Sequence, residues 1–565
     1  MGLVYKQLTK QICRNKVFVI LLLLLTFLTS LSFFFVKFSI DGNMEALKVL
    51  SSLSENQMQY KNALNSNTSL AYTFFASTIG LTAFVFMMFF YRFFRTNQKQ
   101  MGCLKSLGFK DWSLCTYFII FVAVLSIIGA LLGFVVGYFL SSVLINANIR
   151  TYSVTGLVKG INLSSILIGL LGSTLVFCLI AVIGYSFVHG KESGELISGK
   201  NNKKSKSRFL RIANVIVGII PCKNKFPLRI ALRKPLAVVL IIVAVMGFSV
   251  CIILGQSLNI SSKKVFHSQT DGHNYEYDTR YDHYRTKKVL DHGVRYIEHP
   301  AELVIGGYDI EQTVVGLYDL NELYELQNVS ETRVAVPSVG TIYVNLGLAD
   351  TYDVEVGDTL TLDVANTSYH LTVAEIATNA KTACIYMNAE ELTMLLGIPE
   401  GSYNGLWSMD TSTGDGFSVD KEQRMVDLER NAVSNQISGI INQVIGSVVG
   451  CILIFLALYV NFQDNTRDML LLNLFGYQAK EIRKMLIDVY RPIVCTSFVI
   501  SIIPSIWIAR FIQRSLSLSI NDYMPFGTSI IIVILIFVGL NLIYWLVQTV
   551  FTVGINHLIR KEANF

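Results

Sequence analysis

The sequence predicts a polytopic α-helical membrane protein with eight transmembrane helices, arranged as two four-helix repeats, and one mixed α/β extracytoplasmic domain. Three observations support this fold class: the composition, the spacing of apolar stretches and a segment that occurs twice. Of the 565 residues, 52% are hydrophobic and only 15% are charged, and the mean hydropathy is +0.49. Soluble globular chains are less apolar, so the composition excludes a wholly soluble protein.

Eight stretches are apolar and long enough to cross a bilayer, for which a helix needs about 20 residues. They comprise residues 17–38, 72–94, 114–140, 164–187, 235–254, 437–459, 493–512 and 529–550. Because Arg14 and Lys16 precede the first stretch, a cleaved signal peptide is the alternative for this segment. A signal peptide has a shorter apolar run and a small-residue cleavage site, so we interpret the first stretch as a membrane anchor.

The distribution of basic residues predicts the orientation in the membrane, because lysine and arginine near the spans are retained on the cytoplasmic side. The loop after the second span is basic, and the linker at residues 191–234 is rich in lysine and arginine with only two acidic residues, Glu192 and Glu195. Both termini are then cytoplasmic, and residues 256–435 lie outside. The basic linker either enforces this topology, which we favour, or binds anionic lipid headgroups.

Two segments of the chain share a pattern at a constant offset. They are YRFFRTNQKQMGCLKSLGF, starting at Tyr91, and YVNFQDNTRDMLLLNLFGY, starting at Tyr459. The identical positions follow one another at spacings of three and four residues, which places them on one helix face. Each helix is expected to end at a glycine in the left-handed position after its last turn. The shared pairs are Tyr91/Tyr459, Phe94/Phe462, Asn97/Asn465, Met101/Met469, Leu104/Leu472 and Gly108/Gly476.

The repeat indicates a tandem duplication, because both segments follow the second span of a group of four. A weaker similarity precedes the first and fifth spans, between QICRNKVFVILLLL and IALRKPLAVVLIIV. An even number of spans in each half predicts the same orientation and a pseudo-twofold axis along the membrane normal. We therefore divide the chain into a first repeat at residues 1–190, the linker at 191–234 and a second repeat at 235–565. The shared helix face either packs inside its own half or is presented twice to a soluble partner.

The two halves differ in their external segments. The first has a short loop at residues 39–71, which reads as an amphipathic helix that packs near the larger domain, with Leu47, Leu50, Leu53 and Leu64 on its apolar side. The second has a domain at residues 256–435, large enough for its own core. Alternating residues around the turn signals VGD and ANTS in TIYVNLGLADTYDVEVGDTLTLDVANTSYHLTVAEIA predict hairpins, and NAEELTMLLG predicts a helix capped by Asn388.

Histidines gather near the start of the external domain, together with aspartates. A metal sensor is one interpretation of this cluster. The spacings match no compact ligand pattern, so we favour a solvated surface and expect no metal site. The residues are His267, His273, His283, His292 and His299, with Asp271, Asp282 and Asp291.

The sequence contains no GxxxxGK[ST] motif, and Gly-rich spots such as SGELISGK lack the strand and helix that hold a phosphate. We therefore expect no nucleotide cofactor in this chain. The sequence also lacks a recognisable set of nucleophile, base and orienting residue. An enzyme acting on lipid or cell wall, the alternative class, would need its site in the external domain.

The segments LRIALRKP and QMGCLKSLGF resemble those of the FtsX-like permeases, the membrane subunits of MacB-type ABC transporters. The family motif has an acidic residue, an aliphatic pair, a basic residue, a small residue and then an aliphatic residue with glycine. The first copy has Gln100 in place of the acid, and the second keeps Asp468 but has Asn473 and Leu474 at the basic and small positions. The resemblance implies coupling helices that bind an ATPase through Asn97, Met101, Leu104, Lys105, Gly108, Asn465, Met469, Leu472 and Gly476.

The resemblance further implies a permease subunit in the bacterial cell membrane, where two copies of a soluble ABC ATPase bind ATP and Mg²⁺ and drive movement of the external domain. The expected task is export of, or resistance to, amphiphilic compounds or antimicrobial peptides. The alternatives are an FtsX-type regulator of a cell-wall hydrolase or lipoprotein, and a nonenergised membrane sensor. Membrane lipid is an expected partner and nucleic acid is not.

Overall fold

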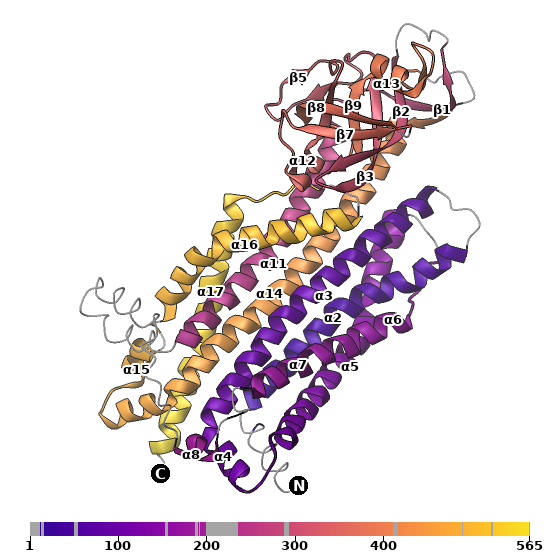
Figure 1. The fold of residues 1–565 in the computed structure, drawn as a ribbon. Coiled ribbons are helices and arrows are strands. Elements are labelled where there is room, and N and C mark those ends of the chain that lie inside the picture. The colour runs from indigo at the N-terminus through magenta and orange to yellow at the C-terminus, as the bar shows by residue number, and fades with distance from the viewer. Residues whose placement is uncertain are drawn as a thin grey trace. The chain divides into compact units, whose positions relative to one another are not determined.

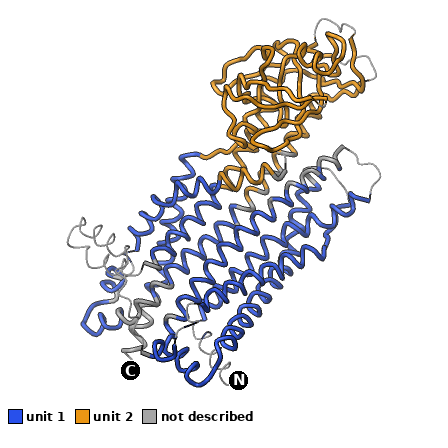
Figure 2. The backbone as a smooth tube through the Cα atoms, viewed as in Figure 1, with its two compact units in different colours: residues 1–253, 441–509, 529–565 blue, residues 254–440, 510–528 orange. Residues whose placement is uncertain are grey.

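The computed structural model describes residues 16–49, 55–152, 156–186, 192–198, 235–286, 293–365, 367–410, 416–486, 490–520 and 524–563, with the single residues 9, 12, 190 and 488 (Figure 1). The chain forms two compact units (Figure 2). The helical unit comprises residues 1–253, 441–509 and 529–565, and the β-rich unit comprises residues 254–440 and 510–528. Residues 510–528 were not expected to join the external domain.

The longest of the described helices are mostly apolar, as the composition predicts. Those of the first half are α2 (Lys16–Val49), α3 (Glu55–Thr96), α4 (Gln98–Ser106), α5 (Asp111–Tyr152), α6 (Leu163–Ile166), the π-helix η1 (Leu167–Gly172), α7 (Ser173–Tyr185) and α8 (Ser193–Ser198). Those of the second half are α11 (Pro235–Ser268), α14 (Lys421–Leu474), α15 (Ala479–Leu486), α16 (Tyr490–Ile520) and α17 (Ile530–Ala563).

Within the described residues, 7 helices are long and apolar enough to cross a membrane, by length and composition. The predicted span at residues 437–459 lies inside α14, where the apolar part is the shorter stretch Gly446–Tyr459. The polar residues Ser438, Asn442 and Gln443 interrupt the start of the predicted window. Several helices can therefore span a membrane, which fits a multi-pass membrane protein.

The loop predicted at residues 39–71 does not form a separate amphipathic helix. Instead α2 continues to Val49 and α3 begins at Glu55, so the two spans extend into a helical hairpin. Leu47 and Leu64 are buried against Ile40 and Tyr60 of the same hairpin. The helical period was predicted correctly, but these apolar residues extend the core between α2 and α3. The other two leucines of the prediction, Leu50 and Leu53, lie outside the described residues.

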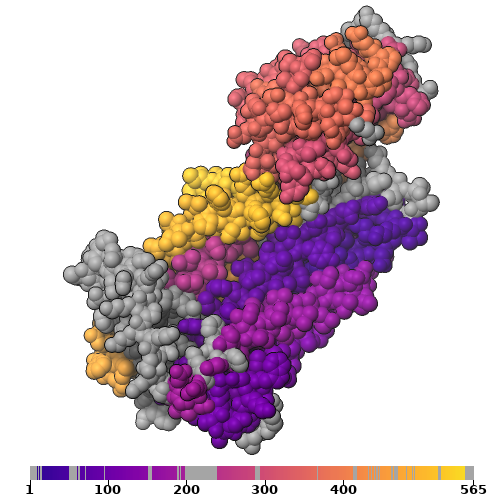
Figure 3. Space-filling view, in the orientation of Figure 1, coloured from indigo at the N-terminus to yellow at the C-terminus, as the bar shows by residue number. Residues whose placement is uncertain are grey.

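The first-half helices pack through aromatic side chains and glycines. Phe33, Phe34 and Phe75 form a buried cluster. A Cβ at Gly133 of α5 would lie 2.7 Å from the backbone nitrogen of Leu31 in α2. Small residues allow helices in a membrane to approach this closely. These helices consequently form one block, coloured indigo to magenta in the space-filling view (Figure 3).

The second half packs in a similar way, with one difference in α16. A Cβ at Gly450 of α14 would lie 2.5 Å from the ring of Phe248 in α11, so these helices also approach closely. Pro504 lies inside α16. Because proline lacks a backbone N–H, α16 loses one helical hydrogen bond there and can bend at this point.

The β-rich unit contains one sheet of nine strands in the order β11-β1-β10-β2-β3-β9-β6-β8-β7. Strand β2 also pairs with β7, so the six strands from β2 to β7 in this order close into a barrel. The strands are β1 (Tyr277–Arg285), β2 (Val294–Ile305), β3 (Tyr308–Leu317), β6 (Thr341–Asn345), β7 (Thr359–Val364), β8 (Thr367–Ala377), β9 (Cys384–Asn388), β10 (Tyr403–Ser408) and β11 (Phe417–Asp420), with β4 (Leu326–Gln327) and β5 (Arg333–Val334) as a separate pair.

The hairpin and the helix cap predicted in this domain are partly confirmed. Strands β7 and β8 form the hairpin expected around ANTS. Helix α13 (Ala389–Leu396) is capped by Asn388, whose Oδ1 accepts hydrogen bonds from the backbone nitrogens of Glu390 and Glu391. The hairpin expected around the turn signal VGD (residues 356–358) is wrong, because this turn connects α12 (Leu346–Tyr352) to β7 and joins no pair of strands. The side chain of Asn345 caps that helix and Leu348 fills the barrel core.

The histidine cluster is only partly a solvated surface. His267 and His283 are exposed, but His273 is 2% exposed and stacks on Tyr324 with ring centroids 4.7 Å apart. The sequence around His273 is polar and does not indicate this contact, because Tyr324 lies on a distant segment of the chain. No group of three or more His, Cys, Asp or Glu side chains in the described part of the chain is placed to hold a metal ion. His292 and Asp291 lie outside the described residues.

Candidate partner-docking turns

The two repeated segments end in the same backbone turn. In the first copy, Gly108 N donates to Lys105 O at 3.0 Å and Phe109 N donates to Leu104 O at 3.2 Å. This pair of bonds defines a Schellman motif, in which a left-handed residue ends the helix. Gly108 has φ +88°, and a Cβ there would meet no atom within 4 Å. The backbone angle alone therefore requires glycine.

The second copy repeats these bonds at the equivalent positions. Gly476 N donates to Asn473 O at 3.0 Å and Tyr477 N donates to Leu472 O at 3.1 Å. Gly476 has φ +89°. The predicted left-handed glycine is thus confirmed in both copies. We call residues 97–112 the first turn segment and residues 465–480 the second turn segment.

The helices that lead into the turns differ. The second turn segment ends the continuous helix α14, in which Asn465 lies. In the first, Asn97 lies between α3 and α4 with ψ 20°, and its side-chain amide donates to Phe93 O at 2.9 Å. A side chain that bonds to the carbonyl four residues back competes with the helical backbone. The single helix expected in the first copy is therefore interrupted at Asn97.

The shared face is buried in part. Met101 is 0% exposed and Met469 is 3% exposed, so these two predicted contact residues face their own unit. Leu104 and Leu472 are half-buried. Of the two alternatives for the shared helix face, packing inside its own half is therefore the correct one for the two methionines. Asn465 has a described backbone in α14, but its side chain lies outside the described part.

Helix α8, from the start of the basic linker, covers part of the first turn segment. A Cβ at Gly102 would lie 2.9 Å from Leu196 Cβ and 2.9 Å from Ile197 Cγ1. Leu196 is fully buried. Only glycine at position 102 allows α8 to lie this close to α4. The sequence pattern did not predict this contact, because α8 has only 6 residues.

Lys105 is not the exposed cation that the motif suggested. Its ammonium lies 2.7 Å from Asp111 Oδ1, and the Lys105 side chain is only 7% exposed. Tyr185 of α7 donates to the same carboxylate oxygen at 2.8 Å. This ion pair joins the end of α4 to the first residue of α5, so it stabilises the turn. Lys99 and Lys110 remain exposed in this segment.

Large apolar side chains are exposed at the tips of both turns. Leu107 is 74% exposed and Phe475 is 78% exposed, and these two residues occupy equivalent positions directly before the shared glycines. Leu474 and Trp112 add exposures of 77% and 75%. Exposed apolar patches of this kind mark protein interaction sites. Comparison of identical residues missed Leu107 and Phe475 because their side chains differ, although both positions are apolar.

The return helices begin where the sequence predicts, but the second is broken. Helix α5 starts at Asp111 directly after the first turn, and α15 starts at Ala479 after the second. Glu481 Oε2 accepts from Gln478 N at 3.0 Å, which stabilises the start of α15. The second return then continues as the separate helix α16. Asp488, between α15 and α16, accepts a hydrogen bond from Gln548 of α17 at 2.6 Å.

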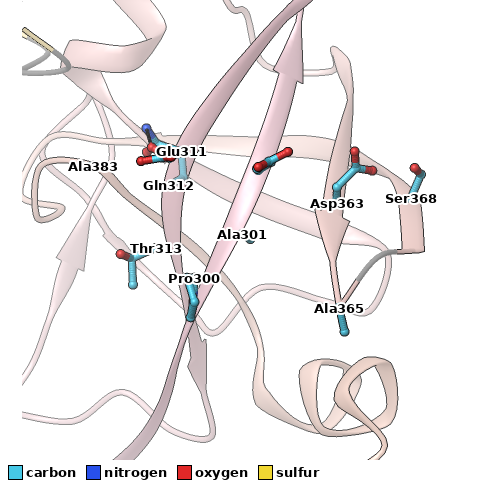
Figure 4. A pocket seen from close by; sticks show the side chains of 10 residues that line it. Pro300, Ala301, Glu311, Gln312, Thr313, Asp363, Ala365, Ser368 and Ala383 are labelled. Carbon is cyan, nitrogen blue, oxygen red and sulfur yellow. Dashed lines mark hydrogen bonds between the residues drawn. The ribbon is translucent and has the colours of Figure 1, made fainter.

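The β-rich unit carries a groove of about 740 Å³, drawn with its lining side chains in Figure 4. Three carboxylates line it, from Glu302, Glu311 and Asp363, and Glu302 is the cross-strand neighbour of both others. Gln312 also lines the groove, but its strand places the side chain on the barrel side with Ile310 and Val314. The groove is therefore acidic.

Residues 72–190 and 443–554 match the family model of the FtsX-like permease C-terminal domain. Each matched part contains one turn segment and the helices on either side of it. The match includes neither α2, α11 nor residues 254–440 of the β-rich unit. No curated protein matches the chain.

Proposed function

Because residues 72–190 and 443–554 both match the FtsX-like permease family, we propose that this chain is the membrane subunit of an ABC transporter and binds two soluble ATPase subunits. The family match itself indicates a membrane permease component of an ABC-type system. The observation that carries the finer proposal is the repeated turn. Both copies end in the same Schellman motif and expose an apolar side chain, Leu107 or Phe475, directly before the glycine.

The proposed mechanism is of the MacB type, in which the transporter transmits motion. ATP and Mg²⁺ bind in the partner ATPase, and hydrolysis moves the two turn segments with the helices attached to them. The β-rich unit responds because α11 and α14 lead directly into it from the helical unit. This chain supplies no catalytic residue and binds no nucleotide. We place both termini in the cytoplasm of a bacterial cell and residues 256–435 outside, as the basic loops favour.

The proposed task is export of, or resistance to, amphiphilic compounds such as antimicrobial peptides. An acidic groove in the β-rich unit suits cationic peptides by charge. Regulation of a cell-wall hydrolase or lipoprotein, as in FtsX-type systems, remains the second candidate. A nonenergised sensor is the third, and it requires no ATPase. Lipid surrounds the spans in each case.

The test is to co-purify the chain with its soluble partners and to identify an ABC ATPase among them. Leu107→Asp and Phe475→Asp place a charge on each apolar tip, and we expect each variant to retain about half the ATPase and the double variant almost none. Val158→Asp is the matched control, since Val158 is also apolar and 52% exposed but lies in the connection between α5 and α6. Full retention by the double variant would contradict docking at the tips. A chain that binds no ATPase at all would favour the sensor.

A further inference from the structure

Helix α12 is fixed to the barrel of the β-rich unit. Asn345 Oδ1 accepts from Leu348 N at 2.6 Å and so caps the start of the helix. Leu348 is fully buried among the barrel residues. The helix ends at Asp353, which has a left-handed φ of 54°. A force applied to α12 is therefore passed to the whole barrel, because packed cores move as rigid bodies.

Two aspartates of α12 and its cap contact the end of α16. Arg510 Nη2 lies 2.9 Å from Asp350 Oδ1 and 3.3 Å from Asp353 Oδ1. Arg514 Nη1 lies 2.5 Å from Asp353 Oδ2. Asp350 Oδ2 also accepts from Phe526 N at 2.6 Å, in the connection between α16 and α17. We call Asp350, Asp353, Arg510 and Arg514 the α12–α16 joint.

A buried polar network also anchors α16, beside the two arginines. Gln513, between the two arginines, is 2% exposed, and its Nε2 donates to Ser261 Oγ at 2.8 Å and to Met524 O at 3.2 Å. Ser261 in turn donates to Pro525 O at 2.6 Å. The outer ends of α11 and α16 and the segment after α16 are thus joined. The end of α16 is held as part of the β-rich unit, to which residues 510–528 belong.

The joint gives residues 254–440, which carry the barrel, a third attachment. The first two are covalent, through α11 and α14. Two attachments leave a body free to turn about the line between them, and a third fixes that rotation to the motion of α16. Helix α16 follows the second turn segment through α15, and Pro504 lies inside α16 shortly before Arg510. Movement at the docking turn can therefore reach the barrel through α15 and α16.

The ion pairs of the joint are suited to break and re-form. The side chains of Arg510, Arg514 and Asp353 are 49%, 39% and 58% exposed. Exposed ion pairs contribute only about 0 to 1 kcal/mol each, so their exchange costs little. The buried Gln513 network is costly to disrupt and would keep α16 in place meanwhile. The Gln513 network thus holds α16 in place, while the ion pairs of the joint can exchange.

We propose that the α12–α16 joint couples α16 to the β-rich unit, so that its charges transmit to the barrel the movement produced by ATP hydrolysis. This inference rests on the proposed function. It assigns Asp350, Asp353, Arg510 and Arg514 a role that neither the family match nor the sequence pattern assigns. They position the barrel and bind no substrate.

The experiment measures amide hydrogen exchange in the full complex with its ATPase, without nucleotide and with ADP and vanadate. The wild type should show a nucleotide-dependent difference both at α15 and at residues 346–352. Arg510→Gln/Arg514→Gln should keep the difference at α15 and lose most of that at residues 346–352. Arg510→Lys/Arg514→Lys retains both charges and should keep the two differences.

Arg333→Gln is the matched control, because Arg333 pairs with Glu325 at 2.8 Å in the same unit but away from α12. Unchanged protection of β6 and β9 in every variant shows that the barrel remains folded. If the glutamine double variant keeps the full nucleotide-dependent difference in exchange at residues 346–352, the proposed coupling through the joint is wrong. A wild type with no difference at α15 contradicts the proposed function, and a difference at α15 alone contradicts only the joint.

Discussion

Gly108 and Gly476 adopt nearly the same left-handed backbone, with φ of 88° and 89°, and each donates its N–H to the carbonyl three residues back at 3.0 Å. Two distant segments have thus kept one turn geometry, although their side chains differ around it. A turn of this kind fixes the direction in which the chain leaves the helix. The same backbone geometry therefore sets the direction of the chain at both turns, which carry the exposed apolar side chains.

Gly108→Val and Gly476→Val should each weaken the stimulation of ATP hydrolysis by several-fold. A β-branched residue at positive φ is strained by roughly 1–2 kcal/mol, which the turn can relieve only by changing its angle. The measurement is ATPase activity of the complex in proteoliposomes. Gly108→Asn and Gly476→Asn are the matched controls, since asparagine tolerates this conformation, and they should retain most activity. Full coupling in both valine variants would contradict a role for the turn angle.

The sequence predicts the turns well because their requirements are local. A helix that ends at a glycine, with an aromatic residue, a polar residue and then a new helix after it, needs no information from the rest of the fold. The same holds for the Asn388 cap of α13, where the side chain bonds to amides of the next residues. The apolar spans were also predictable, since lipid demands apolar residues around the whole helix.

Features that depend on distant segments could not be predicted. The closure of the barrel rests on pairing of β2 with β7, and nothing local in either strand specifies that register. The close approach of α8 to Gly102 joins two separate segments, and the α12–α16 joint brings Asp353 to Arg514. The sequence shows these charges and apolar residues, but their partners are set by packing.

Gly102→Val should displace α8 from the first turn segment. The added side chain would meet Leu196 and Ile197 at 2.9 Å, and overpacking of this kind costs typically about 1–3 kcal/mol. The expected result is faster amide exchange at residues 193–198. Gly194→Ala is the control, because a Cβ at Gly194 would meet nothing within 4 Å. Equal protection in Gly102→Val and the wild type would show that α8 does not depend on this close approach.

The purified complex should contain one copy of this chain and two ATPase subunits. Two fused halves already present two turns, so a second copy of the chain is not needed to complete a pair of docking sites. The mass of the detergent-solubilised complex, measured by native mass spectrometry, checks this. The single variant Phe475→Asp should shift the main species to one ATPase per chain. A complex with two copies of this chain would refute the fused-pair arrangement.

His273 should make the β-rich unit less stable as the pH falls below about 6.5. Burial, and then the nearby Lys381 ammonium, lower the pKa of His273 from 6.5 to about 3. The unfolded chain therefore takes up a proton between these values and the folded unit does not. The stability is complete above the unfolded pKa and declines by up to about 1.4 kcal/mol per pH unit toward the folded pKa.

This decline can be separated from the titration of Asp278. That carboxylate is opposed by burial, but Lys381, Arg280 and the Tyr296 hydroxyl together hold its pKa below the ordinary 3.8, so it acts only in stronger acid. The measurement is the midpoint of urea unfolding of the β-rich unit between pH 7.5 and 4.5, detected by limited proteolysis of the full chain. His273→Gln should reduce the dependence on pH, because glutamine keeps a donor for Asn379 O but does not titrate. His370→Gln, at an exposed position on β8, is the control and should keep the wild-type slope. Equal slopes in all three proteins would mean that His273 is not the titrating group.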